Sequence, residues 1–273
     1  MRRFSAEYLR RTRRGMWADS RAALGDLDLA GRKRVLDAGA GTGELTAVLH
    51  EETDAEVVAV DADPALLAET APDTPVVAGD ATRLPFPVDA FDLVVCQALL
   101  INLPDPAAAV AEFARVSSDL VAAIEPDNGA VSITSTVDAE ATVTARARKA
   151  FLAGVDTDPT LGGEGARELL AGAGLDVLGT RRYVHEHATE PPYAAADLAA
   201  ARRKATGEAL DRQRGALLAG PLDEASYDEL RADWRAMGRR AVEQMQRGEY
   251  RRREHIPFYV TVGTVGETDD GSG

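Results

Sequence analysis

Short apolar runs alternate with helix-like stretches between residues 34 and 126. Five of these runs carry polar residues only near their ends, which is typical of strands buried on both faces of a parallel sheet. They span 34–39, 56–62, 75–81, 91–97 and 119–126. Asp63-Pro64 and Asp105-Pro106 each place a helix N-cap before a proline at the first helical position. The alternation predicts a doubly wound α/β fold.

The alternation loosens after Pro126. Helices are expected over 136–153, 163–174, 193–217 and 222–248, and strands over 175–188 and 255–265. An insertion as long as residues 189–254 between two strands is uncommon unless it is functional, so we expect it to form a cap over a substrate. The expected fold is a mostly parallel seven-stranded sheet with a helical insertion before the last strand.

This pattern divides the chain into five parts. We expect an N-terminal lid helix in residues 1–30, a core in 31–188, the helical cap in 189–254, the last core strand in 255–265 and a disordered tail in 266–273.

Composition narrows the possible functions of the 273-residue chain. Its net charge of -14 argues against binding to nucleic acid, because phosphates would be repelled. No apolar run approaches the roughly 20 residues needed to cross a membrane, and the N-terminus lacks the apolar part of a secretory signal. The single cysteine, Cys96, excludes an intrachain disulfide and a cysteine-based zinc site. We therefore expect a cytoplasmic protein without a membrane anchor.

The acidic, lysine-poor composition is typical of proteins adapted to high salt, although a GC-rich genome would also favour alanine, glycine and arginine. The histidines His185, His187 and His255 are not spaced as a metal site with nearby carboxylates, so we expect no bound metal.

The most informative segment is VLDAGAGTG, residues 35–43, in which a strand with Asp37 near its end leads into a glycine-rich turn and a helix. Glycine is needed where the backbone turns sharply or lies against a ligand. Gly39 and Gly41 fit the first two glycines of a dinucleotide-binding turn, but Glu44 stands at the third. A carboxylate facing a pyrophosphate is repulsive, so a ligand without phosphates suits this turn better.

Three further segments follow in order. Asp61 ends the second predicted strand, where a carboxylate can accept hydrogen bonds from both ribose hydroxyls, although NAD would be held in the same way. GDATRLPF follows the third strand, and FDLVVCQALLINLPDP contains the fourth. Together with the glycine turn, these segments resemble the class I methyltransferases that depend on S-adenosylmethionine (SAM).

The resemblance covers residues 34–126 and implies SAM as the cofactor. It places Asp80 and the next backbone amide at the adenine. The cofactor-binding residues that it implies are Asp37, Gly39, Ala40, Gly41, Gly43, Asp61, Ala62, Asp80, Ala81 and Gln97. Many relatives carry a histidine where this chain has Ile101-Asn102, so no histidine catalyst is carried over, and we assign no catalytic residue.

Residues outside the motifs are candidates for closing the site. In small-molecule methyltransferases of this type a leading helix often covers SAM, so Arg13 is a candidate for the methionine carboxylate, and Tyr8 or Trp17 for the methyl channel. The alternative is that these residues only dock the helix. Glu125 and Asn128 follow the fifth strand and are candidates to orient a substrate, or else simply a turn and its cap.

These observations favour a SAM-dependent methyltransferase that acts on a small molecule, with the acceptor unassigned. One alternative is a non-catalytic SAM-binding sensor or a subunit of a larger enzyme. Another is an NAD-dependent oxidoreductase, which needs a proton-relay Tyr-x-x-x-Lys or histidine pair that we do not find in the sequence.

Overall fold

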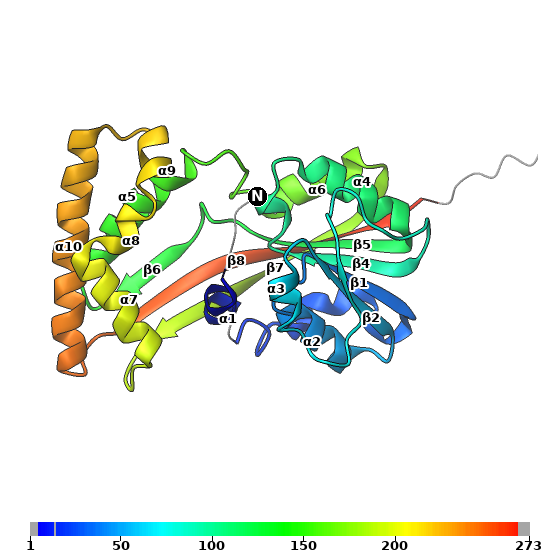
Figure 1. The fold of residues 1–273 in the computed structure, drawn as a ribbon, viewed down its shortest axis with the longest axis horizontal. Coiled ribbons are helices and arrows are strands. Elements are labelled where there is room, and N and C mark those ends of the chain that lie inside the picture. Colours follow the sequence, from blue (N-terminus) through cyan, green and yellow to red (C-terminus); the bar gives the residue numbers. More distant parts are fainter. Residues whose placement is uncertain (1–4, 14, 267–273) are drawn as a thin grey trace, which may run out of the picture. The chain divides into compact units, whose positions relative to one another are not determined.

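The computed structural model describes residues 5–13 and 15–266 (Figure 1). The chain divides into two compact units. The first comprises Met1–Asp127, Leu161–Val184 and Pro257–Gly273, and the second comprises Asn128–Thr160 and His185–Ile256. The second unit therefore includes residues 128–160, which the sequence pattern had grouped with the core.

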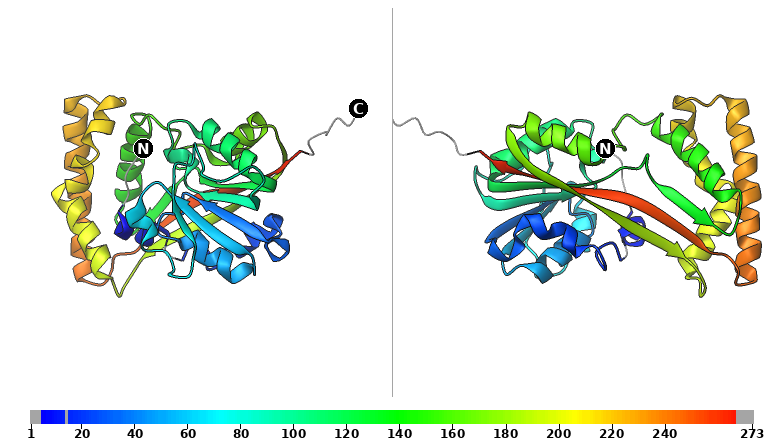
Figure 2. Two further views of the ribbon diagram at one scale, coloured as in Figure 1. Left: turned by 45° about the vertical axis from the view of Figure 1, so that its right-hand side comes forward. Right: turned by 180° about the vertical axis from the view of Figure 1, so that it is seen from behind.

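The first unit is built on the expected mostly parallel sheet. Its strands are β1 (Arg34–Ala38), β2 (Glu56–Asp61), β3 (Val76–Ala78), β4 (Phe91–Gln97), β5 (Ser117–Pro126) and parts of β7 (Leu175–Thr189) and β8 (Arg252–Val265). The order is β3-β2-β1-β4-β5-β8, with β7 also paired to β8. Pairs among the first five strands are parallel, whereas β8 runs antiparallel to β5. Figure 2 shows the long β7 and β8 from behind.

Helices cover both faces of this sheet (Figure 1). They are α2 (Glu44–Glu52), α3 (Pro64–Leu67), α4 (Pro106–Val116) and α6 (Gly162–Gly172), preceded by α1 (Ala6–Arg13). The carboxylates of Asp63 and Asp105 accept hydrogen bonds from the first turns of α3 and α4, at 3.0 Å each, which confirms both Asp-Pro helix starts. The helices pack on fully buried strand residues such as Leu36 and Val94, so the carboxyl ends of the strands are left to the loops.

The second unit is mainly helical. It contains β6 (Ser132–Ser135), α5 (Glu140–Leu152), α7 (Ala195–Thr206), α8 (Glu208–Asp211), α9 (Arg214–Ala219) and α10 (Glu224–Gln246). The prediction of a single helix over 193–217 is wrong, because the chain forms the three shorter helices α7, α8 and α9 there. Gly207 ends the first of them with a φ of 87°, and an added Cβ would lie 3.3 Å from the Arg231 and Arg235 side chains. Strand β6, which the sequence pattern did not predict, pairs with Arg252–His255 of β8.

Some expectations concern the ends of the chain. The N-terminal helix is present as Ala6–Arg13, whereas Arg14 lies outside the described residues. The tail that we expect to be disordered, residues 266–273, lies outside the described residues from 267 onward. Within the described ranges, no helix combines the length and the apolar character that a membrane span requires.

Candidate functional site

The turn between β1 and α2 is shaped by glycines. Gly39 and Gly41 have φ values of 73° and 60°, in the region that disfavours residues with a Cβ. A Cβ on Gly39 would lie 2.7 Å from Leu99 Cδ1, and one on Gly41 would lie 3.1 Å from Leu9 Cδ1. The amides of Gly39 and Ala40 donate to the Val60 carbonyl at 2.8 and 3.0 Å. The turn is therefore fixed against the end of β2.

Asp61 joins this turn to the next one. Its side chain is buried, with Oδ2 accepting from the Gly41 amide at 2.9 Å and Oδ1 accepting from the Asp63 amide at 2.8 Å. Each carboxylate oxygen can accept more than one hydrogen bond. Asp61 is thus held by the backbone while it keeps the capacity to bind hydroxyl groups.

Asp37 has an unsatisfied oxygen. Its Oδ2 accepts from the Thr46 hydroxyl at 2.6 Å, whereas Oδ1 is buried and has no hydrogen-bond partner. Burial raises the pKa of Asp37 to about 6, and the Thr46 hydroxyl and the charge of Arg13 oppose this shift. A buried acceptor without a donor is costly, so this oxygen is suited to a donor from a ligand.

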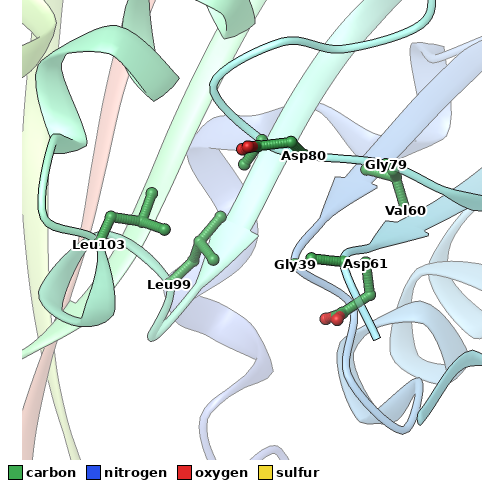
Figure 3. A pocket seen from close by; sticks show the side chains of 9 residues that line it. Gly39, Val60, Asp61, Gly79, Asp80, Leu99 and Leu103 are labelled. Carbon is green, nitrogen blue, oxygen red and sulfur yellow. The ribbon is translucent and has the colours of Figure 1, made fainter. Parts of the chain in front are cut away.

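A pocket opens at the carboxyl ends of the first strands (Figure 3). It is lined by Gly39, Val60, Asp61, Ala62, Gly79, Asp80, Ala81, Leu99 and Leu103. The structure therefore brings together five of the residues that the sequence assigned to the cofactor. Figure 3 shows the two leucines on one side of the pocket and Asp61 on the other. Oδ1 of Asp80 accepts from the Thr82 amide and hydroxyl, at 2.9 Å each, and these bonds lower the pKa of Asp80.

Glu125 fixes the segment that carries Leu99, one of the two leucines that line the pocket. It is fully buried, and its Oε1 accepts from the amides of Leu99 and Leu100 at 3.0 and 2.9 Å. Burial raises the pKa of Glu125 to about 7, although these backbone hydrogen bonds oppose the shift. The sequence suggested Glu125 as a substrate contact, but its carboxylate is instead engaged by the backbone. Its role is to position the segment that carries Leu99.

Arg13 of α1 reaches the glycine turn. Its Nη2 donates to the Gln97 carbonyl at 3.3 Å, and its Nη1 lies 3.7 Å from Glu44 Oε2. Only 10% of the Arg13 side chain is exposed. The structure thus places a guanidinium beside the turn and the end of β4, close to two of the predicted cofactor residues, Gly41 and Gln97.

The other suggested substrate residues lie in different surroundings. Tyr8 is on α1 and is 43% exposed, whereas Trp17 is buried with its ring centroid 5.1 Å from that of Tyr183. Asn128 belongs to the second unit, where its side-chain amide donates to the Pro159 carbonyl at 2.8 Å. Tyr183 was missed by the sequence analysis, because one tyrosine in the polar pattern of 175–188 carries no signal of its own.

The electrostatics of the turn favour a ligand without phosphates. Glu44 is the first residue of α2, where a dinucleotide would place its pyrophosphate, and its Oε2 is buried without a hydrogen-bond partner. Within residues 5–13 and 15–266 there is no group of three or more His, Cys, Asp or Glu side chains able to hold a metal ion. Cys96 is buried in the sheet, with its Sγ 3.8 Å from Glu125 Oε1.

Comparison with known proteins agrees with this arrangement. Residues 36–119 match the methyltransferase domain family, a stretch that includes the glycine turn, Asp61 and Asp80. Over this stretch the chain is similar to that methyltransferase domain. The matched stretch contains most of β1, all of β2 to β4 and α4, and thus the acidic residues at the ends of β1 and β2.

Solved structures share the fold over most of the chain. A protein from Anaeromyxobacter dehalogenans, described as a type II methyltransferase, superposes with a TM-score of 0.58 at 20% identity, covering 90% of this chain and 96% of that one. A protein described as a methyltransferase from Bacillus halodurans superposes with a TM-score of 0.54 at 16% identity, covering 91% and 99%. At such low identities these superpositions show a shared fold and nothing more.

Curated relatives match a shorter stretch. The chain is 43% identical over 99 residues to a demethylmenaquinone methyltransferase of Mycolicibacterium paratuberculosis, and 40% identical over 100 residues to that of Beutenbergia cavernae. Each match covers 36% of this chain and 41% of the relative. The similarity therefore supports the methyltransferase domain and leaves the acceptor of this protein unassigned.

Proposed function

We propose that this protein is a SAM-dependent methyltransferase that acts on a small-molecule acceptor. The observation that carries the proposal is the buried, unpartnered Oδ1 of Asp37, which lies two residues before Gly39 of the glycine turn. The amino group of SAM is a cation with three donors, so it would satisfy this oxygen and stabilise the charged carboxylate.

The remaining side chains fit the other parts of SAM. Gly39 and Gly41 adopt positive φ values and pack closely on Leu99 and Leu9, so the turn presents its main chain without side chains of its own to the ligand. Asp61 would accept hydrogen bonds from the ribose hydroxyls, and Asp80 one from the adenine amine. Leu99 would pack on the face of the adenine ring. Arg13 would pair with the carboxylate, in competition with Glu44.

The chemistry of transfer asks little of the protein beyond placement. When bound, SAM supplies an electrophilic methyl group on a positively charged sulfur. The chain's residues would hold the two reactants in line and exclude water. We assign no general base, because one is needed only if the acceptor must lose a proton before it attacks.

A small-molecule acceptor suits the charge of the chain. The net charge of -14 disfavours nucleic acid as a substrate. The demethylmenaquinone methyltransferases match this chain over 99 or 100 residues only, so their named acceptor is not carried over.

The proposal is tested by following a labelled methyl group. The protein is incubated with methyl-labelled SAM and the small-molecule fraction of a cell extract, and labelled products are separated by chromatography. We expect label in at least one product with the unaltered protein. Asp61→Ala should reduce SAM affinity by about tenfold or more, since it removes a charged acceptor from the site.

Asp63→Asn is the matched control. Asp63 also follows β2, but its side chain caps α3 and does not line the pocket, and asparagine retains the cap. SAM affinity should therefore be unchanged in this variant. Binding of SAM without any labelled product would favour the non-catalytic sensor, whereas equal affinity in Asp61→Ala would remove Asp61 from the site.

A further inference from the structure

The contacts proposed above for SAM leave three further polar side-chain atoms of the first unit buried without a hydrogen-bond partner, one of them on Gln97, which the sequence resemblance had assigned to the cofactor. They are Nε1 of Trp17, Oε1 of Gln97 and the hydroxyl of Tyr183. The three residues are 5%, 2% and 8% exposed. An unsatisfied buried polar group costs about 1–3 kcal/mol, so such groups are rare in proteins unless a ligand or water satisfies them.

The three side chains lie together. The ring centroids of Trp17 and Tyr183 are 5.1 Å apart. The Gln97 amide lies close enough to the Tyr183 hydroxyl to favour its ionised form, although the two do not make a well-formed hydrogen bond. Gln97 Nε2 also donates to the sulfur of Met16, which precedes Trp17, at 2.7 Å. We call Trp17, Gln97 and Tyr183 the aromatic cluster.

The aromatic cluster adjoins the cofactor residues. Gln97 is the last residue of β4, next to Cys96, which pairs with Ala38 just before the glycine turn. Its backbone carbonyl accepts from Arg13, which also lies beside Gly41. Ligands of open α/β sheets bind at the carboxyl ends of the strands, so the cluster is at the correct edge for the second reactant.

We propose that the aromatic cluster binds the methyl acceptor, and that the acceptor is a neutral, planar aromatic compound with a hydroxyl group. This inference rests on the proposed function. The indole N–H is a donor, Gln97 Oε1 is an acceptor, and the Tyr183 hydroxyl is either. A hydroxyl group on the acceptor can both accept from the indole and donate to Gln97.

The surroundings favour an aromatic and uncharged compound. Tyr183 stacks on Phe258, with centroids 5.4 Å apart, so the two rings and the indole provide flat apolar surfaces. Burial raises the pKa of Tyr183 well above its usual value, which keeps its hydroxyl neutral. The guanidinium of Arg13, which donates to the Gln97 carbonyl, is also directed to Glu44.

The test measures binding of 1-naphthol by calorimetry to protein saturated with S-adenosylhomocysteine. Cyclohexanol serves as the probe that has a hydroxyl but no planar ring. We expect 1-naphthol to bind and cyclohexanol to bind at least about tenfold more weakly. Tyr183→Phe removes only the hydroxyl, and Trp17→Phe removes the indole N–H together with its five-membered ring. Both keep an aromatic ring, and each should weaken 1-naphthol binding about tenfold.

Controls separate this inference from the proposed function. Affinity for S-adenosylhomocysteine should be unchanged in both variants, and Tyr193→Phe, in the second unit, should leave 1-naphthol binding unaltered. If S-adenosylhomocysteine does not bind the unaltered protein, the proposed function fails. If it binds but 1-naphthol does not, or binds Tyr183→Phe equally well, the cluster is structural and only this inference is overturned.

Discussion

Three carboxylates near the carboxyl ends of parallel strands have different roles because their partners differ. Asp61 accepts hydrogen bonds from two backbone amides and lines the pocket. Asp37 is buried with one oxygen unpartnered. Glu125 is buried, and its carboxylate accepts hydrogen bonds from the amides of Leu99 and Leu100. A carboxylate at the same kind of strand end therefore lines the pocket in one case and binds the protein's own backbone in another.

The burial of Glu125 makes stability depend on pH. Its pKa is raised from 4.5 to about 7, so the folded state binds the proton more tightly than the unfolded chain does. The free energy of unfolding should fall as pH rises from about 4.5 to about 7, by about 3 kcal/mol from this group alone. Asp37, with a pKa raised from 3.8 to about 6, contributes with the same sign at lower pH.

Glu125→Gln isolates this contribution. Glutamine keeps an oxygen to accept from Leu99 and Leu100 but does not ionise. Urea unfolding of this variant at pH 5 and pH 8 should show a smaller loss of stability with rising pH than the unaltered protein shows. Equal slopes in the two proteins would mean that Glu125 does not titrate in this range.

At the scale of elements, the turn between β1 and α2 depends on local backbone geometry and on a neighbouring loop. Gly39→Ala places a Cβ 2.7 Å from Leu99 at a φ of 73°. We expect it to destabilise the protein by about 1–3 kcal/mol and to weaken SAM binding, as measured by thermal unfolding and calorimetry.

Gly174→Ala provides the matched control in the same unit. Its φ is 83°, but a Cβ there would have no neighbour within 4 Å. This variant should suffer only the backbone strain, with SAM affinity unchanged. If both variants bind SAM equally well, the contact between the turn and Leu99 does not matter for the site.

The elements also show what the sequence can and cannot predict. The strand over 91–97 was predicted to the residue, because a buried parallel strand is apolar except near its ends. Strand β6 was missed, since Ser132–Ser135 is short and polar and its strand form depends on pairing with β8. The break at Gly207 was missed because a glycine within a helical pattern is often tolerated.

Some residues of the candidate site can be predicted from the sequence, whereas others cannot. Asp37, Gly39, Asp61 and Asp80 are found from the sequence because their spacing along consecutive strands is set by the fold. Tyr183 and the buried role of Glu125 depend on which distant segments pack together, and no local pattern records that packing.

At the scale of the whole molecule, the two units differ in what holds them together. The first is organised around an apolar sheet. The second contains a buried ionic group, in which Glu140 is fully buried and pairs with Lys204 at 2.5 Å and Arg252 at 3.4 Å. The hydroxyl of Tyr250 donates to the same carboxylate at 2.9 Å. Desolvation raises the pKa of Glu140 but is outweighed by these cations, so its pKa is lowered.

Glu140→Ala should therefore destabilise the second unit by about 3–5 kcal/mol, because it leaves Lys204 and Arg252 buried without their shared partner. Hydrogen exchange should accelerate in α5 and α10. Glu208→Ala, which breaks an exposed ion pair with Arg212 in the same unit, should cost less than about 1 kcal/mol. Similar effects of the two substitutions would contradict a structural role for the buried group.

The central claim is that the turn after β1 and the carboxylate of Asp61 bind SAM. Calorimetric titration of the unaltered protein with SAM and, separately, with NAD⁺ tests this claim most directly. We predict one SAM bound per chain and no heat from NAD⁺, because Glu44 lies where a pyrophosphate would be placed. Binding of NAD⁺ in the absence of SAM binding would contradict the account.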